Sequence, residues 1–134
     1  MSTLTGFFSP MNPYDFNRLT PGRIVMAGVD DMHGRGWKVR PLVILSKPET
    51  NSPEAEFRVA CGSRTAPEPG NEYFAVEVIG ITNGHPRTGL VATTWFYAYW
   101  LRTVQISEIA SILKFFPEHD FLRLVEIIRS AGSV

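Results

Sequence analysis

Short apolar runs rich in β-branched and aromatic residues, broken by glycine and proline, constrain the fold of this chain most strongly. Two of them, residues 24–29 and 42–45, flank a glycine- and cation-rich stretch that is predicted to be a loop over residues 30–39. Further runs with strand character follow at residues 57–61, 73–79 and 90–99. Residues 101–106 either continue the last of these strands or begin another. The pattern is that of a sheet built from short strands.

The end of the chain has a different period. Apolar residues between 121 and 128 recur at helical spacing, and Pro117 can occupy the first helical position, where its missing N–H costs nothing. Gly132 can end this helix. Residues 109–115 are predicted as a short helix before it. Several short strands followed by a C-terminal helix indicate a mainly β fold with a strongly bent sheet or small barrel.

The chain has 134 residues, enough for one domain with its own core, and it has no internal repeat. Residues 1–20 hold prolines, which oppose a regular element, and aromatic residues, which are scarce in disordered segments. We therefore expect an N-terminal arm over residues 1–20, packed on the domain or on a partner chain. The domain itself is expected to span residues 21–134.

Composition excludes several classes of function. Thirteen basic and thirteen acidic residues balance, so a nucleic-acid partner would need a local basic patch. The single cysteine, Cys61, excludes an intrachain disulfide and fits a reducing compartment. The three histidines lie far apart in the sequence, and we predict no metal and no cofactor. No run reaches membrane-spanning length and no export signal is present, so a cytoplasmic protein without a membrane partner is expected.

Cations and hydroxyls stand beside two of the predicted strands. Three cations come just before the strand at residues 42–45, namely Arg35, Lys38 and Arg40. The strand at residues 57–61 is followed closely by a second polar group, Ser63, Arg64 and Thr65. If the two strands are neighbours in the sheet, Arg40 and Ser63 lie at adjoining strand ends.

This constellation has a metal-free chemical use. A guanidinium can hold a phosphate by two parallel hydrogen bonds, and a nearby hydroxyl could position or deprotonate a ribose 2′-OH. Together they would suffice for RNA cleavage by in-line attack of the 2′-OH, with the arginine stabilising charge on the phosphate. The alternative is an ordinary β-hairpin whose loop cations are only solvated.

Aromatic residues allow two interpretations as well. The run at residues 95–100 could stack on the bases of single-stranded RNA, but its composition favours core packing combined with a subunit interface. Trp37 lies in a glycine-rich cationic loop. For this residue, base stacking, a partner contact and structural packing all stay open.

Four segments, in order, resemble the PemK/MazF toxin family over about residues 21–130. They are Pro-Gly-Arg-Ile-Val at 21–25, Gly-Trp-Lys-Val-Arg-Pro-Leu-Val-Ile-Leu-Ser at 36–46, Val-Ala-Cys-Gly-Ser at 59–63, and the strand-and-helix pattern from 112 to 128. Residues 93–97 are Thr-Thr-Trp-Phe-Tyr, where family members often carry an acidic-Gln-x-Arg cluster.

The resemblance implies an SH3-like barrel, usually a homodimer. It also implies a metal-independent endoribonuclease that acts on single-stranded RNA and pairs with a small cognate antitoxin. Arg40 matches the catalytic arginine before proline, and Ser63 stands where the catalytic threonine normally lies, with Thr65 as the fallback. The loop at residues 30–39 matches a mobile loop that helps to cover RNA or antitoxin.

These observations lead to two hypotheses. In the first, the chain is a toxin-like ribonuclease in which Arg40 and Ser63 are catalytic. The substrate-binding residues would then be Arg35, Trp37, Lys38, Arg64 and Thr65. In the second, the same barrel is a non-catalytic binding module that holds or inhibits a protein partner through Trp37 and the aromatic strand. An inactive structural homologue is a third interpretation.

Overall fold

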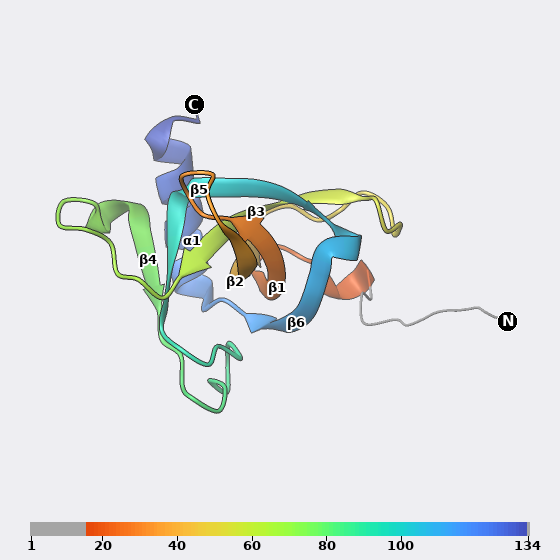
Figure 1. The fold of residues 1–134 in the computed structure, drawn as a ribbon, viewed down its shortest axis with the longest axis horizontal. Helices are drawn as coiled ribbons and strands as arrows, with labels where there is room; N and C mark the ends of the chain where they lie inside the picture. Colours follow the sequence, from red (N-terminus) through yellow and green to blue (C-terminus); the bar gives the residue numbers. More distant parts are fainter. Residues whose placement is uncertain (1–15, 134) are drawn as a thin grey trace, which may run out of the picture.

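The computed structural model describes residues 16–133, so most of the predicted N-terminal arm lies outside the described residues. Six antiparallel strands form one curled sheet, a half-barrel, and one α-helix follows (Figure 1). The elements are β1 (Arg23–Asp30), β2 (Trp37–Ile44), β3 (Glu56–Ser63), β4 (Ala75–Val78), β5 (Thr94–Gln105), β6 (Ile109–Phe115) and α1 (Glu118–Ile128). Short 3₁₀ turns lie at Phe16–Arg18, Glu72–Phe74 and Ile106–Glu108, and a π-helical turn at Arg129–Ser133 ends the described chain.

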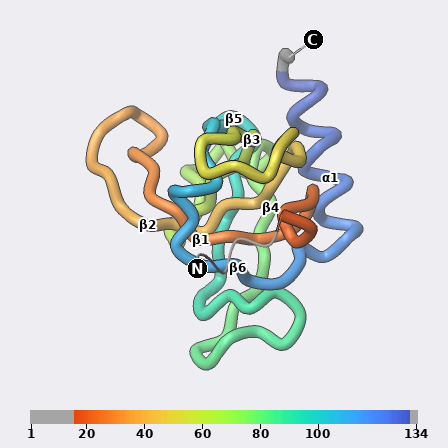
Figure 2. Tube along the Cα trace, turned by 90° about the vertical axis from the view of Figure 1, so that its right-hand side faces the viewer, coloured from red at the N-terminus to blue at the C-terminus, as the bar shows by residue number. Residues whose placement is uncertain are grey.

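The order of strands in the sheet is β4-β5-β3-β2-β1-β6. The predicted hairpin is present, with β1 and β2 paired from Ile24 and Val43 to Asp30 and Trp37. The sheet curls strongly enough for Arg102 on β5 to reach Asp30 at the end of β1, although β3 and β2 stand between them in the sheet order. Figure 2 shows α1 on one side of the curled sheet and the β1–β2 loop projecting on the other.

Two apolar clusters lie on the two faces of the curled sheet. One fills the inside of the curl, where Leu42, Val59 and Trp100 are buried. The other lies under α1, where Ala60 and Leu124 belong to the same cluster. Side chains along β3 alternate between the two clusters, because successive residues of a strand point to opposite faces of the sheet. Strand β3 is therefore packed against apolar side chains on both of its faces near its C-terminal end.

Several predicted boundaries are corrected by the structure. Residues 109–115 form strand β6 and not a helix, because they pair with the edge of β1. The predicted loop over residues 30–39 is shorter, since β1 runs to Asp30 and β2 already starts at Trp37. The strand predicted at 90–99 begins only at Thr94, and residues 101–105 continue it. The strand predicted at 73–79 is reduced to β4, preceded by a 3₁₀ turn.

Strand β5 contains a large bulge that shapes the site. Its pairing with β3 jumps from Leu101 opposite Ala60 to Phe96 opposite Gly62, which leaves residues 97–100 without a partner on β3, although Tyr97 still pairs with Ala75 of β4. A bulge bends the strand and redirects its side chains. The first part of β5 lies between β4 and the end of β3 and pairs with both, whereas the last part pairs with β3. Among the described residues, no helix is long and apolar enough to cross a membrane.

Candidate functional site

The site lies where β2 and β3 separate. The ladder between them ends at Leu42 opposite Cys61. The next residue on β2 is Pro41, which has no N–H to continue the ladder. Beyond this point the strands diverge, and Arg40 and Ser63 both line the pockets that open there. The two strands are neighbours, as expected, although Arg40 lies within β2 and only Ser63 lies at a strand end.

Gly62 allows β5 to pass close to this fork. A Cβ at residue 62 would lie 2.5 Å from the Thr94 methyl carbon and 3.0 Å from the Phe96 ring. Because real Cβ atoms do not approach other atoms so closely, a larger residue would push β5 away from the pocket. Gly62 therefore allows the side chains of β5 to lie close to β3 at this point.

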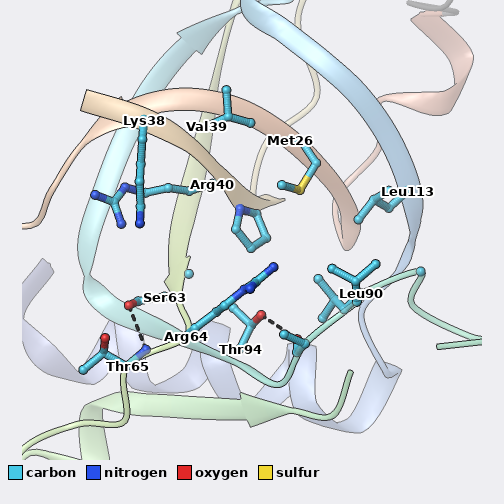
Figure 3. A pocket seen from close by; sticks show the side chains of 15 residues that line it. Met26, Lys38, Val39, Arg40, Ser63, Arg64, Thr65, Leu90, Thr94 and Leu113 are labelled. Atoms are coloured by element: carbon cyan, nitrogen blue, oxygen red, sulfur yellow. Dashed lines mark hydrogen bonds between the residues drawn. The ribbon is translucent and has the colours of Figure 1, made fainter. Parts of the chain in front are cut away.

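The first pocket, here the leucine pocket, has a volume of about 400 Å³. Its apolar lining includes Met26, Pro41, Leu90 and Leu113. Its polar lining includes Lys38, Arg40, Ser63 and Arg64. Figure 3 shows Lys38 and Arg40 near Ser63 at one end and the apolar side chains at the other. Thr94 also lines this pocket, but its hydroxyl already donates to the carbonyl of Ala92 at 3.0 Å.

The second pocket, here the tyrosine pocket, has a volume of about 660 Å³. Its walls come from the β1–β2 loop, from the bulge of β5 and from the segment after β3. The bulge contributes Tyr97, Tyr99 and Trp100. Arg40, Ser63 and Thr65 line both pockets and therefore form a shared wall between them.

The Arg40 side chain has no ion pair or hydrogen bond in the described part of the chain. Its Nε is buried without an acceptor there, and so is the Nε1 of Trp100. The Arg40 guanidinium carbon lies 5.1 Å from the centre of the Trp100 ring, a cation–π contact. A buried donor without an acceptor costs about 1–3 kcal/mol. The shared wall thus carries a positive charge that has no anionic partner among residues 16–133.

Other predicted cations divide into two groups. Lys38 and Arg64 line the leucine pocket and, within residues 16–133, have no ion pair. Arg35 lines the tyrosine pocket, but its Nε lies 3.6 Å from the Asp31 carboxylate. With Arg40, these two cations form a local group of basic side chains in a chain of neutral net charge.

The Ser63 hydroxyl and the backbone of Thr65 are held in place on the shared wall. Ser63 Oγ accepts a hydrogen bond from the Thr65 backbone N–H at 3.0 Å, which leaves its own O–H free to donate. The Tyr97 hydroxyl donates to the Thr65 carbonyl at 2.9 Å. Burial, and then the neighbouring Tyr99, raise the pKa of Tyr97, so this phenol stays a donor at neutral pH. The end of β3 is thereby fixed against the bulge of β5.

Contacts from two sides hold the β1–β2 loop. The Asp31 carboxylate accepts the backbone N–H groups of Arg35 at 2.7 Å and His33 at 2.9 Å, which lowers its pKa. Arg102 donates from Nε to Asp30 Oδ1 at 2.9 Å and from Nη2 to the Asp31 carbonyl at 3.0 Å. The resemblance implies mobility for this loop; in the structure its first residues are tied to β5.

Trp37 lies apart from the pockets. A Cβ on Gly28 would come within 1.8 Å of the Trp37 ring, so the indole packs over this glycine on β1. The residue is nevertheless 70% exposed. Of the predicted site residues, Trp37 alone lines neither of the two pockets formed by the described chain. Its substrate-binding role stays a prediction.

Residues 16–133 offer neither a metal-binding cluster nor a reactive thiol. Residues 16–133 contain no group of three or more His, Cys, Asp or Glu side chains that could hold a metal ion. Cys61 is buried beneath the shared wall, and burial raises the pKa of its thiol to about 12. A neutral buried thiol is a poor nucleophile.

One contributor to the site, Arg102, was not predicted. The aromatic run was predicted as core combined with a subunit interface, with base stacking as the alternative; Tyr99 in this run is about half exposed and lines a pocket, because the bulge redirects it. Arg102 carried no signal, since its partners are more than seventy residues away in sequence. The five aromatic residues among the six at 95–100 cannot all face one core, and this was the available hint.

No family model matches the sequence, and no curated protein matches it. Solved structures do. The Mycobacterium tuberculosis toxin MazF-mt6 is 19% identical and has a TM-score of 0.57, with 81% of this chain and 94% of that chain covered. A mycobacterial endoribonuclease in complex with its cognate antitoxin is 16% identical, with a TM-score of 0.58 and coverage of 84% and 92%. The chain has the MazF fold. The MazE–MazF complex of Deinococcus radiodurans is a further match, 16% identical over 84% and 92% of the chains, with a TM-score of 0.54.

The MazF fold agrees with the architecture expected from the sequence, a mainly β domain of the PemK/MazF type with a C-terminal helix. At these identities the likeness establishes the fold alone.

Proposed function

We propose that this chain is a toxin of a toxin–antitoxin system and cleaves single-stranded RNA without a metal ion. The observation that carries the proposal is the position of Arg40. A guanidinium without an ion pair among the described residues lies on the wall shared by two pockets, with the Ser63 hydroxyl on the same wall. The MazF fold of proteins named as toxins and endoribonucleases supports the same assignment.

In the proposed reaction, Arg40 holds the scissile phosphate and assists proton transfer to the leaving oxygen. The ribose 2′-oxygen attacks phosphorus in line to form a 2′,3′-cyclic phosphate and loses its proton to water. The bond between phosphorus and the 5′-oxygen breaks, and that oxygen gains a proton. Ser63 contacts the 2′-OH or a phosphate oxygen, with Thr65 beside it. Lys38 and Arg64 hold flanking phosphates by charge.

The proposal extends to partners and organisation. Two of the structures with this fold are complexes with an antitoxin. We infer a cognate antitoxin for this chain, a homodimer as the functional form and action in the cytoplasm. Residues 1–20 would form the arm and residues 21–134 the catalytic barrel, with Arg35 and Trp37 contributing to substrate binding.

A cleavage assay in EDTA tests the proposal. Mixed-sequence RNA is incubated with the purified chain, with the Arg40→Ala variant and with Arg123→Ala, which removes an exposed arginine from α1. We expect discrete fragments from the first and third proteins. We expect cleavage by Arg40→Ala to be slower by about 100-fold or more, as for loss of a group that stabilises transition-state charge. Full cleavage by Arg40→Ala would exclude the mechanism.

A second function is favoured by a separate observation. Trp37 and Val39 are exposed on β2, 70% and 45% respectively, which suits a module that holds a protein partner. The assay separates the two functions. RNA that stays intact with every variant, together with a partner whose binding depends on Trp37, would favour the non-catalytic module.

A further inference from the structure

We propose that the tyrosine pocket is a nucleobase site in which one base of the RNA stacks on Tyr99. The inference rests on the proposed function and specifies how the substrate lies in the site. The base belongs to a nucleotide that adjoins the phosphate bound at Arg40.

The shared wall sets this arrangement. Arg40, Ser63 and Thr65 line both pockets, so a phosphodiester held at Arg40 has a pocket on each side. Each phosphate in a nucleic acid joins two nucleosides, and the two pockets are where those nucleosides can go. A volume of about 660 Å³ is in the usual range for a pocket that encloses a small organic ligand.

Tyr99 offers a surface that its neighbours in the aromatic run do not. Phe96, Tyr97 and Trp100 are each at most 3% exposed, whereas Tyr99 is 48% exposed and lines the pocket. Its ring centre lies 5.6 Å from that of Tyr97 and 6.0 Å from that of Phe74. These contacts orient the ring while half of the residue stays accessible, and exposed aromatic rings are the surfaces on which single-stranded bases stack.

Charges in the pocket favour a base over a second phosphate. Asp31 and Glu68 both line it, and Arg35 is already paired with Asp31. Apart from Arg40 on the shared wall, no other arginine or lysine without an ion pair lines this pocket in the described chain. A neutral aromatic ligand beside Arg40 therefore fits better than another anion.

Binding of uncleavable oligonucleotides tests the site. The probes are two fluorescent deoxyribonucleotide hexamers, one of mixed sequence and one in which every base is replaced by an abasic unit. Both lack the 2′-OH, so neither is cut, and the phosphates are the same. Affinity is measured for the full chain and for Tyr99→Ala, Tyr99→Phe and Tyr73→Ala. Tyr73 is an exposed tyrosine close in sequence to Phe74 that lines neither pocket.

We expect Tyr99→Ala to bind the mixed hexamer about tenfold more weakly, the loss typical of one stacked base. Tyr99→Phe keeps the ring and should bind within about twofold of the parent, as should Tyr73→Ala. The abasic hexamer should bind equally to all four proteins. Equal affinity of Tyr99→Ala and the parent for the mixed hexamer would overturn the proposal, as would an equal loss for the abasic hexamer.

The outcome separates this inference from the proposed function. RNA cleavage by the parent together with an unchanged affinity of Tyr99→Ala would remove the base site alone. Base-dependent binding at Tyr99 without any RNA cleavage would keep the site and remove the ribonuclease.

Discussion

The leucine pocket and the tyrosine pocket share one wall and differ in almost everything else. Arg40, Ser63 and Thr65 belong to both. The remaining walls of the leucine pocket are largely aliphatic, whereas those of the tyrosine pocket are aromatic and polar. This difference indicates a division of roles, in which the shared wall can supply the catalytic groups while each pocket binds a different part of a substrate. Substitutions in the three regions should therefore have different effects.

The two pockets are also held together differently. The leucine pocket is formed mainly by backbone and aliphatic contacts. The connection between β4 and β5 lies against β6 through the Lys114 N–H and the Thr88 carbonyl at 3.1 Å, with one side-chain bond from Lys114 Nζ to the Pro86 carbonyl at 2.9 Å. The tyrosine pocket depends on side chains, because Arg102 ties the β1–β2 loop to β5. A single substitution should loosen the second pocket more easily than the first.

Ser63→Ala tests the shared wall and should have the largest effect. The hydroxyl is lost while Arg40 remains, so we expect RNA cleavage to fall by about 100-fold, the range for loss of one catalytic hydrogen-bond donor. Affinity for the uncleavable mixed hexamer should change by less than about twofold, since phosphate binding is mainly electrostatic. Ser63→Thr keeps the hydroxyl and serves as the control. Unchanged cleavage by Ser63→Ala would assign the hydroxyl chemistry to Thr65 or to the RNA alone.

Arg102→Ala tests the tyrosine pocket. The substitution removes the guanidinium and with it the hydrogen bonds to the Asp30 carboxylate and the Asp31 carbonyl. Hydrogen bonds to charged groups contribute about 1.5–3 kcal/mol each to the free energy of unfolding. We expect about tenfold weaker binding of the mixed hexamer and faster amide exchange in residues 31–36. Arg123→Ala is the matched control. Unchanged exchange in the loop would show that Asp31 alone holds it.

Val91→Asp tests the leucine pocket and should have a smaller effect. Val91 lines this pocket and is 52% exposed, so the new carboxylate stays solvated. Repulsion between a carboxylate and a phosphate in water is about 1 kcal/mol, so we expect about fivefold weaker binding of the mixed hexamer. Ile81→Asp places the same charge on the same connection at a residue that is 48% exposed and outside both pockets. Equal losses for the two variants would mean that the pocket itself is not used.

Cys61→Ala tests the core beneath the shared wall and should leave RNA binding unchanged. Burial raises the pKa of the Cys61 thiol from 9.0 to about 12. The folded chain thus keeps this proton longer than the unfolded chain does. The stability contribution is fully present below pH 9 and is lost as the pH rises toward 12. Urea unfolding midpoints should fall over this interval, and less steeply for Cys61→Ala. Identical slopes would show that other groups, such as Tyr97, account for the loss.

Local patterns in the sequence predicted the parts of the fold that local physics controls. The hairpin around residues 30–39, the alternation of Phe57, Val59 and Cys61, and the helix after Pro117 are all present. The wrong assignment at residues 109–115 has a tertiary cause. This segment is a strand because β1 offers it an unpaired edge, and no property of the segment alone records that edge.

The sequence by itself determined which chemical groups the candidate site contains, because Arg40-Pro41 directly precedes one apolar run and Ser63 directly follows another. Pro41 also ends the ladder with β3 by a property of the residue alone, its missing N–H. Only the tertiary structure decided what surrounds those groups. The curl of the sheet brings Arg102 to Asp30, and the bulge of β5 turns Tyr99 into a pocket. Both depend on pairing between strands that are distant in sequence.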